Sequence, residues 1–173
     1  MLRIRAATPA DVPVLPSLLQ PYTQEAFGSP WHGSAEALTR DGFGAHFHTI
    51  VAEQSSQLVG FAAWTSSYDL HHCLPGGDVL DLYVTPSRRG RGVAAALLAS
   101  VAAGIHARGG RYLRGQAIDN PISSRFYNRL AVHFPGGVSI VGGGAFARLA
   151  SLAGRPPREL VRAVPPKETN YEA

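Results

Sequence analysis

The sequence has very little cysteine and no long apolar run. Cys73 is the only cysteine among its 173 residues, so no disulfide can form within the chain. A fold held by internal disulfides is therefore excluded, and the composition is compatible with the cytosol. No apolar stretch reaches the roughly 20 residues of a membrane helix, and no apolar segment follows the basic N-terminus. We expect a cytoplasmic protein without a signal peptide or a membrane segment.

Metal-site and nucleic-acid signatures are also missing. The run His71-His72-Cys73 has ligand-type side chains, but neighbouring strand residues point to opposite faces, and no second cluster has structural-zinc spacing. We expect an exposed loop there, and no metal site. The net charge of +4 suits either nucleic acid or a phosphate-bearing small molecule. Because no RNA-binding or zinc-finger signature appears, we expect no nucleic-acid partner.

The chain does contain alternating strand-like and helix-like segments. Hydrophobic periodicity predicts strands at 2–6, 48–53, 58–66, 78–84, 111–118 and 138–141, and helices at 9–22, 35–41, 93–107, 123–130 and 145–153. This order predicts one mixed α/β domain over residues 1–154. Residues 155–173 are rich in proline and charge, which predicts an extended or mobile tail.

A basic, glycine-containing turn lies between the strand 78–84 and the helix 93–107. Unpaired N–H groups at a helix N-terminus form a ready site for phosphate. Gly90 and Gly92 would let a ligand approach the backbone, and nearby arginines add positive charge. The turn therefore predicts a pyrophosphate-binding loop, although a solvated basic turn that holds no ligand stays open.

Three ligand classes compete for this loop. Gly90-x-Gly92-x-x-Ala95 matches the spacing of a dinucleotide fingerprint, but that fingerprint directly follows its strand. Here five residues separate Val84 from Gly90. A P-loop would need Gly-Lys-Ser/Thr at the helix start, and Gly92-Val93-Ala94 does not provide it. The third class is coenzyme A, whose pyrophosphate needs such a cradle.

The same stretch, DLYVTPSRRGRGVAAALL, resembles the acetyl-CoA signature of the GNAT acetyltransferase superfamily. The family pattern Arg/Gln-x-x-Gly-x-Gly/Ala is met by Arg89, Gly92 and Ala94, and 120-NPISSRFYNRL-130 is similar to the family's second signature. The resemblance covers about residues 2–153. It implies a central twisted mixed sheet flanked by helices, in which the parallel strands 78–84 and 111–118 splay apart to bind acetyl-CoA.

The resemblance also implies site residues. The cofactor-binding set would be Leu82, Tyr83, Val84, Arg89, Gly90, Arg91, Gly92, Val93, Ala94, Ala95, Asn120 and Ser123. Tyr127 matches the family tyrosine that donates a proton to the leaving sulfur, although it could instead pack in the core. Asp81 is the candidate for the catalytic base, or else a structural strand carboxylate. Tyr22, Glu25 and Asp78 would bind the substrate.

A subgroup is suggested by 41-DGFGAHFHTIVAE-53 and by the segments that follow it, which resemble diamine acetyltransferases of the spermidine/spermine type. That group carries Glu-Asp where this chain has Leu80-Asp81, so the family base cannot be carried over, and Ala131 replaces a usual glycine. We expect direct acetyl transfer to a small amine, diamine or polyamine, by a homodimer. The alternatives are an amino-acid, aminoglycoside or protein amine as acceptor, or a non-catalytic acyl-CoA sensor.

Overall fold

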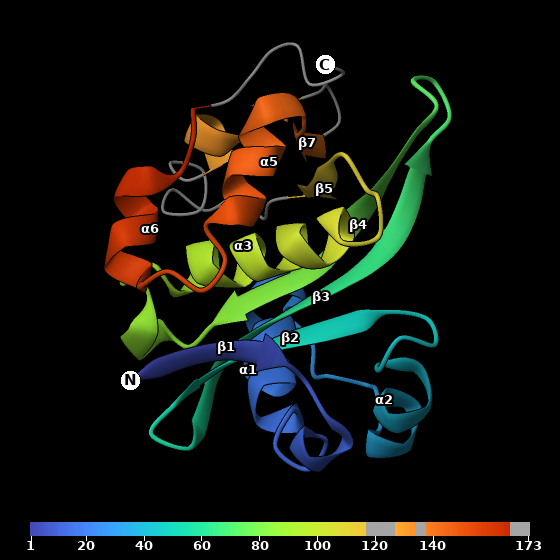
Figure 1. Ribbon diagram of the computed structural model, residues 1–173. Helices are drawn as coiled ribbons and strands as arrows, with labels where there is room; N and C mark the ends of the chain where they lie inside the picture. The colour runs from blue at the N-terminus through green and yellow to red at the C-terminus, as the bar shows by residue number, and fades with distance from the viewer. Residues whose placement is uncertain (117–126, 134–137, 167–173) are drawn as a thin grey trace.

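A seven-stranded mixed sheet forms the centre of the molecule. The computed structural model describes residues 1–116, 127–133 and 138–166. The strands lie in the order β1-β2-β3-β4-β5-β7-β6 (Figure 1). Their bounds are β1 Leu2–Ala6, β2 His48–Gln54, β3 Gln57–Asp69, β4 Leu74–Val84, β5 Leu113–Gln116, β6 Val132–His133 and β7 Val138–Val141. Within the described strands, only β4 and β5 pair in parallel.

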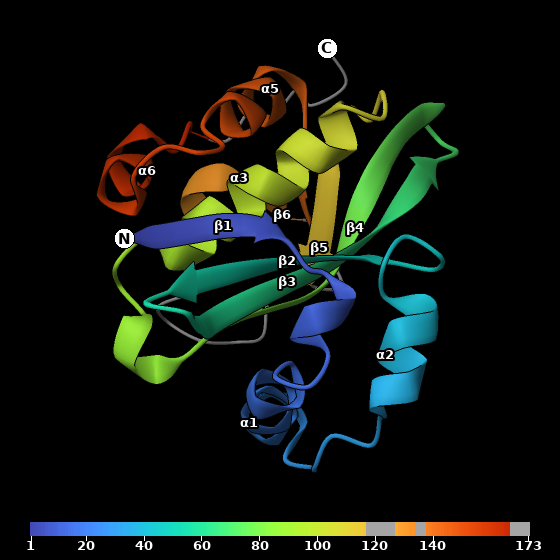
Figure 2. The ribbon, with the colours of Figure 1, turned by 60° about the horizontal axis from the view of Figure 1, so that its bottom comes forward.

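Helices cover both faces of the sheet. Helices α3 (Val93–His106), α5 (Gly143–Ser151) and α6 (Pro157–Ala163) lie on one face, and α1 (Pro16–Phe27) and α2 (Ala35–Asp41) lie on the other (Figures 1 and 2). The core on the α3 face is the larger one, because this alanine- and leucine-rich helix is buried on most of its surface. No helix in the described part of the chain is long and apolar enough to cross a bilayer. The mixed α/β fold is confirmed.

The N-terminal helix begins later than the sequence predicted. Residues Pro9–Asp11 form a 3-10 turn, and α1 starts only at Pro16 and continues to Phe27. Proline has no N–H to donate, so Pro13 interrupts a helix that starts at residue 9, whereas Pro16 is tolerated in a first turn. The start signal itself is present, because the Asp11 carboxylate accepts the N–H of Thr8 at 2.7 Å.

The expectation of an extended tail after residue 154 is corrected for its first part. Residues Pro157–Ala163 form α6, and Leu160 and Val164 are buried in the same core as α3. These two residues are one helical turn apart, so they lie on the same side. A helix that contributes to the core therefore lies within this proline-rich segment. Residues 167–173 lie outside the described chain.

The two parallel strands separate partway along their length, which creates the site. Their pairing runs from Gly77 and Leu113 to Val79 and Gly115, and β4 then continues to Val84 without β5 beside it. Strand β3 still pairs with the other edge of β4 as far as Val84. Within the residues that the structure describes, no strand pairs beyond Val79 with the edge of β4 that faces away from β3.

Candidate active site

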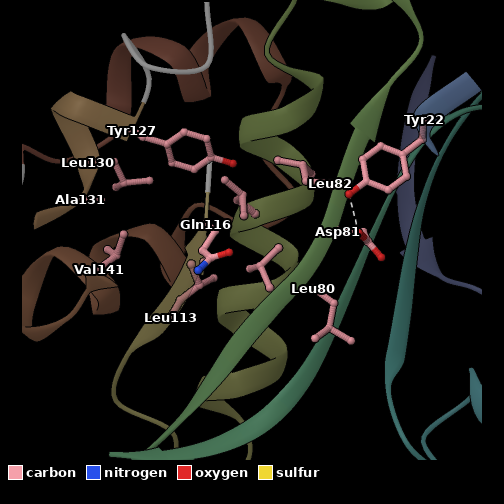
Figure 3. Close-up of a pocket in the computed structure, with 13 residues that line it drawn as sticks. Tyr22, Leu80, Asp81, Leu82, Leu113, Gln116, Tyr127, Leu130, Ala131 and Val141 are labelled. Carbon is pink, nitrogen blue, oxygen red and sulfur yellow. Dashed lines mark hydrogen bonds between the residues drawn. The ribbon is translucent and has the colours of Figure 1, made fainter. Parts of the chain in front are cut away.

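A cavity of about 110 Å³ lies where β4 and β5 separate. Its wall combines apolar side chains with a few polar ones (Figure 3). The lining residues are Tyr22, Val79, Leu80, Asp81, Leu82, Leu98, Leu113, Gly115, Gln116, Tyr127, Leu130, Ala131 and Val141. Because Leu98 belongs to α3 and Tyr22 to α1, the cavity is bordered by elements from both faces of the sheet.

The α1 side of the cavity carries a tyrosine–carboxylate pair. The hydroxyl of Tyr22 donates a hydrogen bond to the carboxylate of Asp81 on β4 (Figure 3). Burial, and then this bond to Asp81, raise the pKa of Tyr22 well above its usual range. Tyr22 is therefore a neutral donor at physiological pH, and Asp81 is an acceptor held at the cavity wall.

Tyr127 lies across the cavity from this pair (Figure 3). It belongs to the helical residues 127–130, and its carbonyl accepts the N–H of Ala131 at 2.7 Å. Burial raises the pKa of Tyr127 to about 12. A phenol with this pKa keeps its proton through the physiological range, so it can donate a hydrogen bond into the cavity.

The predicted cofactor loop stands at the start of α3. Gly90 and Gly92 have φ angles of 70° and 81°, which favour glycine, and Gly92 leaves α3 without a side-chain cap. The space beside Gly90 is open, since a Cβ there would meet nothing within 4 Å. A Cβ on Gly92 would lie 2.1 Å from the carbonyl oxygen of Pro157, so α6 covers this glycine.

Two carboxylates from the predicted substrate set are paired with arginines instead of lining the cavity. Glu25 Oε2 lies 2.6 Å from an Arg89 nitrogen, and the same guanidinium donates to the carbonyl of Val84 at 2.9 Å. Asp78 accepts two hydrogen bonds from Arg114 at 2.9 and 2.8 Å. Of the predicted polar residues in the described chain, the cavity brings together Tyr22, Asp81 and Tyr127.

Two cavity residues were missed by the sequence analysis as site residues. Gln116, at the end of β5, presents its amide to the cavity (Figure 3). Leu80, which was noted only as a departure from the diamine group, is 50% exposed and lines the opening. The signal available in the sequence was Leu80 itself, which stands beside Asp81 where the diamine group has glutamate. Asn120 and Ser123 lie outside the described residues.

The predicted loop at residues 71–73 is the turn between β3 and β4. His71 and Cys73 are exposed. His72 is partly buried, and its Nδ1 lies 2.8 Å from Asp69 Oδ2. Asp69 also accepts the backbone N–H of His71 at 2.9 Å, so its carboxylate organises the turn. Asp69 thus has a local structural role.

Comparisons with known proteins identify a domain and a shared fold. Residues 45–130 match the model of the acetyltransferase (GNAT) domain. A search of the curated proteins finds no matching relative. Among solved structures, a ribosomal-protein-alanine N-acetyltransferase from Brucella melitensis biovar Abortus 2308 is similar, with a TM-score of 0.60 and 23% identity over 73% of this chain and 86% of that one.

Two further structures share the fold. An aminoglycoside acetyltransferase from an uncultured soil metagenomic sample, in complex with trehalose, has a TM-score of 0.62 and 19% identity, and the match covers 73% of this chain and 84% of that one. The PaiA N-acetyltransferase from Thermoplasma acidophilum, in complex with coenzyme A, has a TM-score of 0.59 and 15% identity, over 83% and 99%. At these identities the structural likeness concerns the fold.

Proposed function

We propose an acceptor and a mechanism for this chain from the premise that it is a GNAT N-acetyltransferase, the family whose domain model matches residues 45–130. The acceptor is a small primary amine, and the acetyl group passes to it directly from acetyl-CoA. The observation that carries this proposal is the cavity at the β4–β5 separation, which has a carboxylate on one side and a buried phenol on the other.

The residues around the cavity fit acetyl-CoA. Among the described residues, the edge of β4 beyond Val79 has no strand partner, so its backbone groups could pair with an extended chain such as the pantetheine arm. Open space at Gly90 and the uncapped start of α3 suit a pyrophosphate. Leu82, Tyr83 and Val84 would hold the arm, and Gly90–Ala95 would hold the pyrophosphate. When bound there, acetyl-CoA supplies the acetyl group as a thioester.

The chain must supply proton transfer. An alkyl ammonium has a pKa of roughly 10.4, so deprotonating it at pH 7 costs about 4.6 kcal/mol. Asp81 accepts this proton, directly or through water, so that the nitrogen can form its bond to the acetyl carbon. As the carbon–sulfur bond breaks, the Tyr127 phenol would donate a hydrogen bond to the leaving sulfur, and the second proton lost by the nitrogen would pass to that sulfur or to solvent. A backbone N–H on the open edge of β4 would polarise the carbonyl.

The ion pairs around the cavity bear on which amine is accepted. A diamine or polyamine needs a second carboxylate, but Glu25 is paired with Arg89, and Asp78 with Arg114. Leu80, which stands where the diamine group has glutamate, offers an apolar contact at the opening. Among the residues that the structure describes, which do not include Asp119, these features favour an amine with one positive charge and an apolar substituent over a polyamine.

The test is CoA thiol release from acetyl-CoA across a panel of short alkyl and aryl monoamines, diamines, polyamines, amino acids, aminoglycosides and short peptides. Saturable release with the monoamines supports the proposal, and Asp81→Asn should then lower kcat by about 10²-fold or more. Preference for polyamines would restore the diamine assignment. Release only with aminoglycosides or peptides would show that a larger acceptor enters the cavity and would refute the small-amine proposal.

A further inference from the structure

The ring of Tyr22 is held in place by other aromatic side chains. It packs against Phe61, Phe27 and Tyr83, with centroid distances of 5.7, 5.9 and 6.0 Å. The first two contacts are edge-on, at 88° and 78°. The residue is only 7% exposed, in a core that also contains residues of α1, β2 and β3. Because the ring has little freedom, the direction of its hydroxyl is fixed by packing.

A β-bulge brings Asp81 to that hydroxyl. Trp64 pairs with Val79 and Ala63 pairs with Asp81, so Leu80 is an extra residue in β4. Regular alternation would put Val79 and Asp81 on the same face. With the bulge, Val79 packs against the core around α3, whereas Asp81 contacts Tyr22 of α1 on the opposite face. The bulge thus places the Asp81 carboxylate next to the Tyr22 hydroxyl, whose direction is set by the packing of its ring.

The hydrogen bond engages one of the two oxygens of the Asp81 carboxylate. The Tyr22 hydroxyl binds Asp81 Oδ1. Within residues 1–116, 127–133 and 138–166, no hydrogen bond to Oδ2 is found. Asp81 lines the cavity, and a hydrogen bond to one of its oxygens restrains the side chain and therefore the direction of its second oxygen.

We propose that Tyr22 is a positioning residue, which anchors Oδ1 of Asp81 so that Oδ2 faces the nitrogen of the acceptor amine. This inference rests on the proposed function and changes the role expected for Tyr22, from binding the substrate to orienting the base. Tyr22 therefore acts only through Asp81. Its raised pKa agrees with this assignment, because a phenol that keeps its proton serves as a donor.

A double-mutant cycle tests this dependence. Tyr22→Phe keeps the packed ring and removes the donor, so we expect kcat to fall about 10-fold, the size of one hydrogen bond to a charged group. The KM for acetyl-CoA should not change. In an Asp81→Asn background, the same Tyr22→Phe change should alter kcat by less than about 2-fold, because no base remains to be positioned.

Tyr112→Phe is the matched control. It also removes a buried phenol hydroxyl, which lies 2.9 Å from Ser67 Oγ, and Tyr112 does not line the cavity. Its kcat should equal that of the wild type. An unchanged kcat in Tyr22→Phe would overturn the proposal, as would an equal loss in both backgrounds or a raised KM for acetyl-CoA. Wild-type protein that turns over no amine would instead overturn the proposed function, and this inference with it.

Discussion

Replacing Tyr127 by phenylalanine gives the sharpest test of the proposed chemistry. The change removes one hydroxyl and keeps the ring that lines the cavity. Burial raises the pKa of this phenol to about 12, whereas a thiol has a pKa near ~8.5. Complete proton transfer to the leaving thiolate would therefore be uphill by about 3.5 units, or about 4.8 kcal/mol. Tyr127 is thus expected to stabilise the sulfur by donating a hydrogen bond.

The expected loss follows from that role. Removing one donor to a developing anion typically costs about 2.7–4 kcal/mol, which is roughly 10²–10³-fold in kcat. The assay is steady-state CoA release at saturating amine, with acetyl-CoA affinity measured separately by calorimetry. We expect kcat to fall by about this factor and the affinity to stay the same, while Tyr112→Phe matches the wild type. A loss of less than about threefold, in a variant of unchanged melting temperature, would refute the reasoning.

Three further predictions concern the stability of the fold that carries the site. Arg5 lowers the pKa of Asp11 to about 2 from 3.8, so this carboxylate stabilises the fold above pH 4 and loses its effect as the pH falls through 2. Asp11→Asn should cost about 2 kcal/mol in urea unfolding at pH 7 and almost nothing near pH 2. Leu160→Ala should cost about 2–5 kcal/mol in the same assay, because Leu160 is fully buried; a smaller loss would mean that α6 is not part of the core. Gly92→Ala should lower the melting temperature and weaken acetyl-CoA binding in calorimetry, because its Cβ would meet Pro157; unchanged values would contradict the close packing of α6 on this glycine.

Sequence patterns predicted the bounds of an element well where its own residues carry a clear periodicity. The alternation in 2–6 and the alanine-rich run after Gly92 correspond to β1 and α3 within a residue of the predicted bounds. The N-terminal helix was placed too early, because the start signal at Thr8 is real but closes only a 3-10 turn. Helix α6 was missed, because its proline-rich surroundings are typical of a tail, and only burial of Leu160 distinguishes it.

The sequence likewise predicted some features of the candidate site and missed others. Tyr127, Asp81 and Tyr22 were all named from the sequence, and all three line the cavity. The sequence did not indicate that Glu25 and Asp78 would form ion pairs. Glu25 and its partner Arg89 are 64 positions apart, and Asp78 and Arg114 are 36 positions apart. Charge alone marks a carboxylate as a possible ligand for an amine. Whether the carboxylate is available depends on which arginine the fold brings beside it.

The sequence by itself determined the order of the strands and helices up to β5, the glycine-containing turn before α3 and the residue types that acetyl transfer needs. These features are local, since periodicity, caps and turns involve residues only a few positions apart. Tertiary structure alone decided that β4 and β5 separate beyond Val79, that the bulge at Leu80 turns Asp81 toward α1, and that Tyr22, 59 positions away, meets it. Such contacts depend on how whole elements pack to bury their apolar faces, and no short stretch of sequence contains that information.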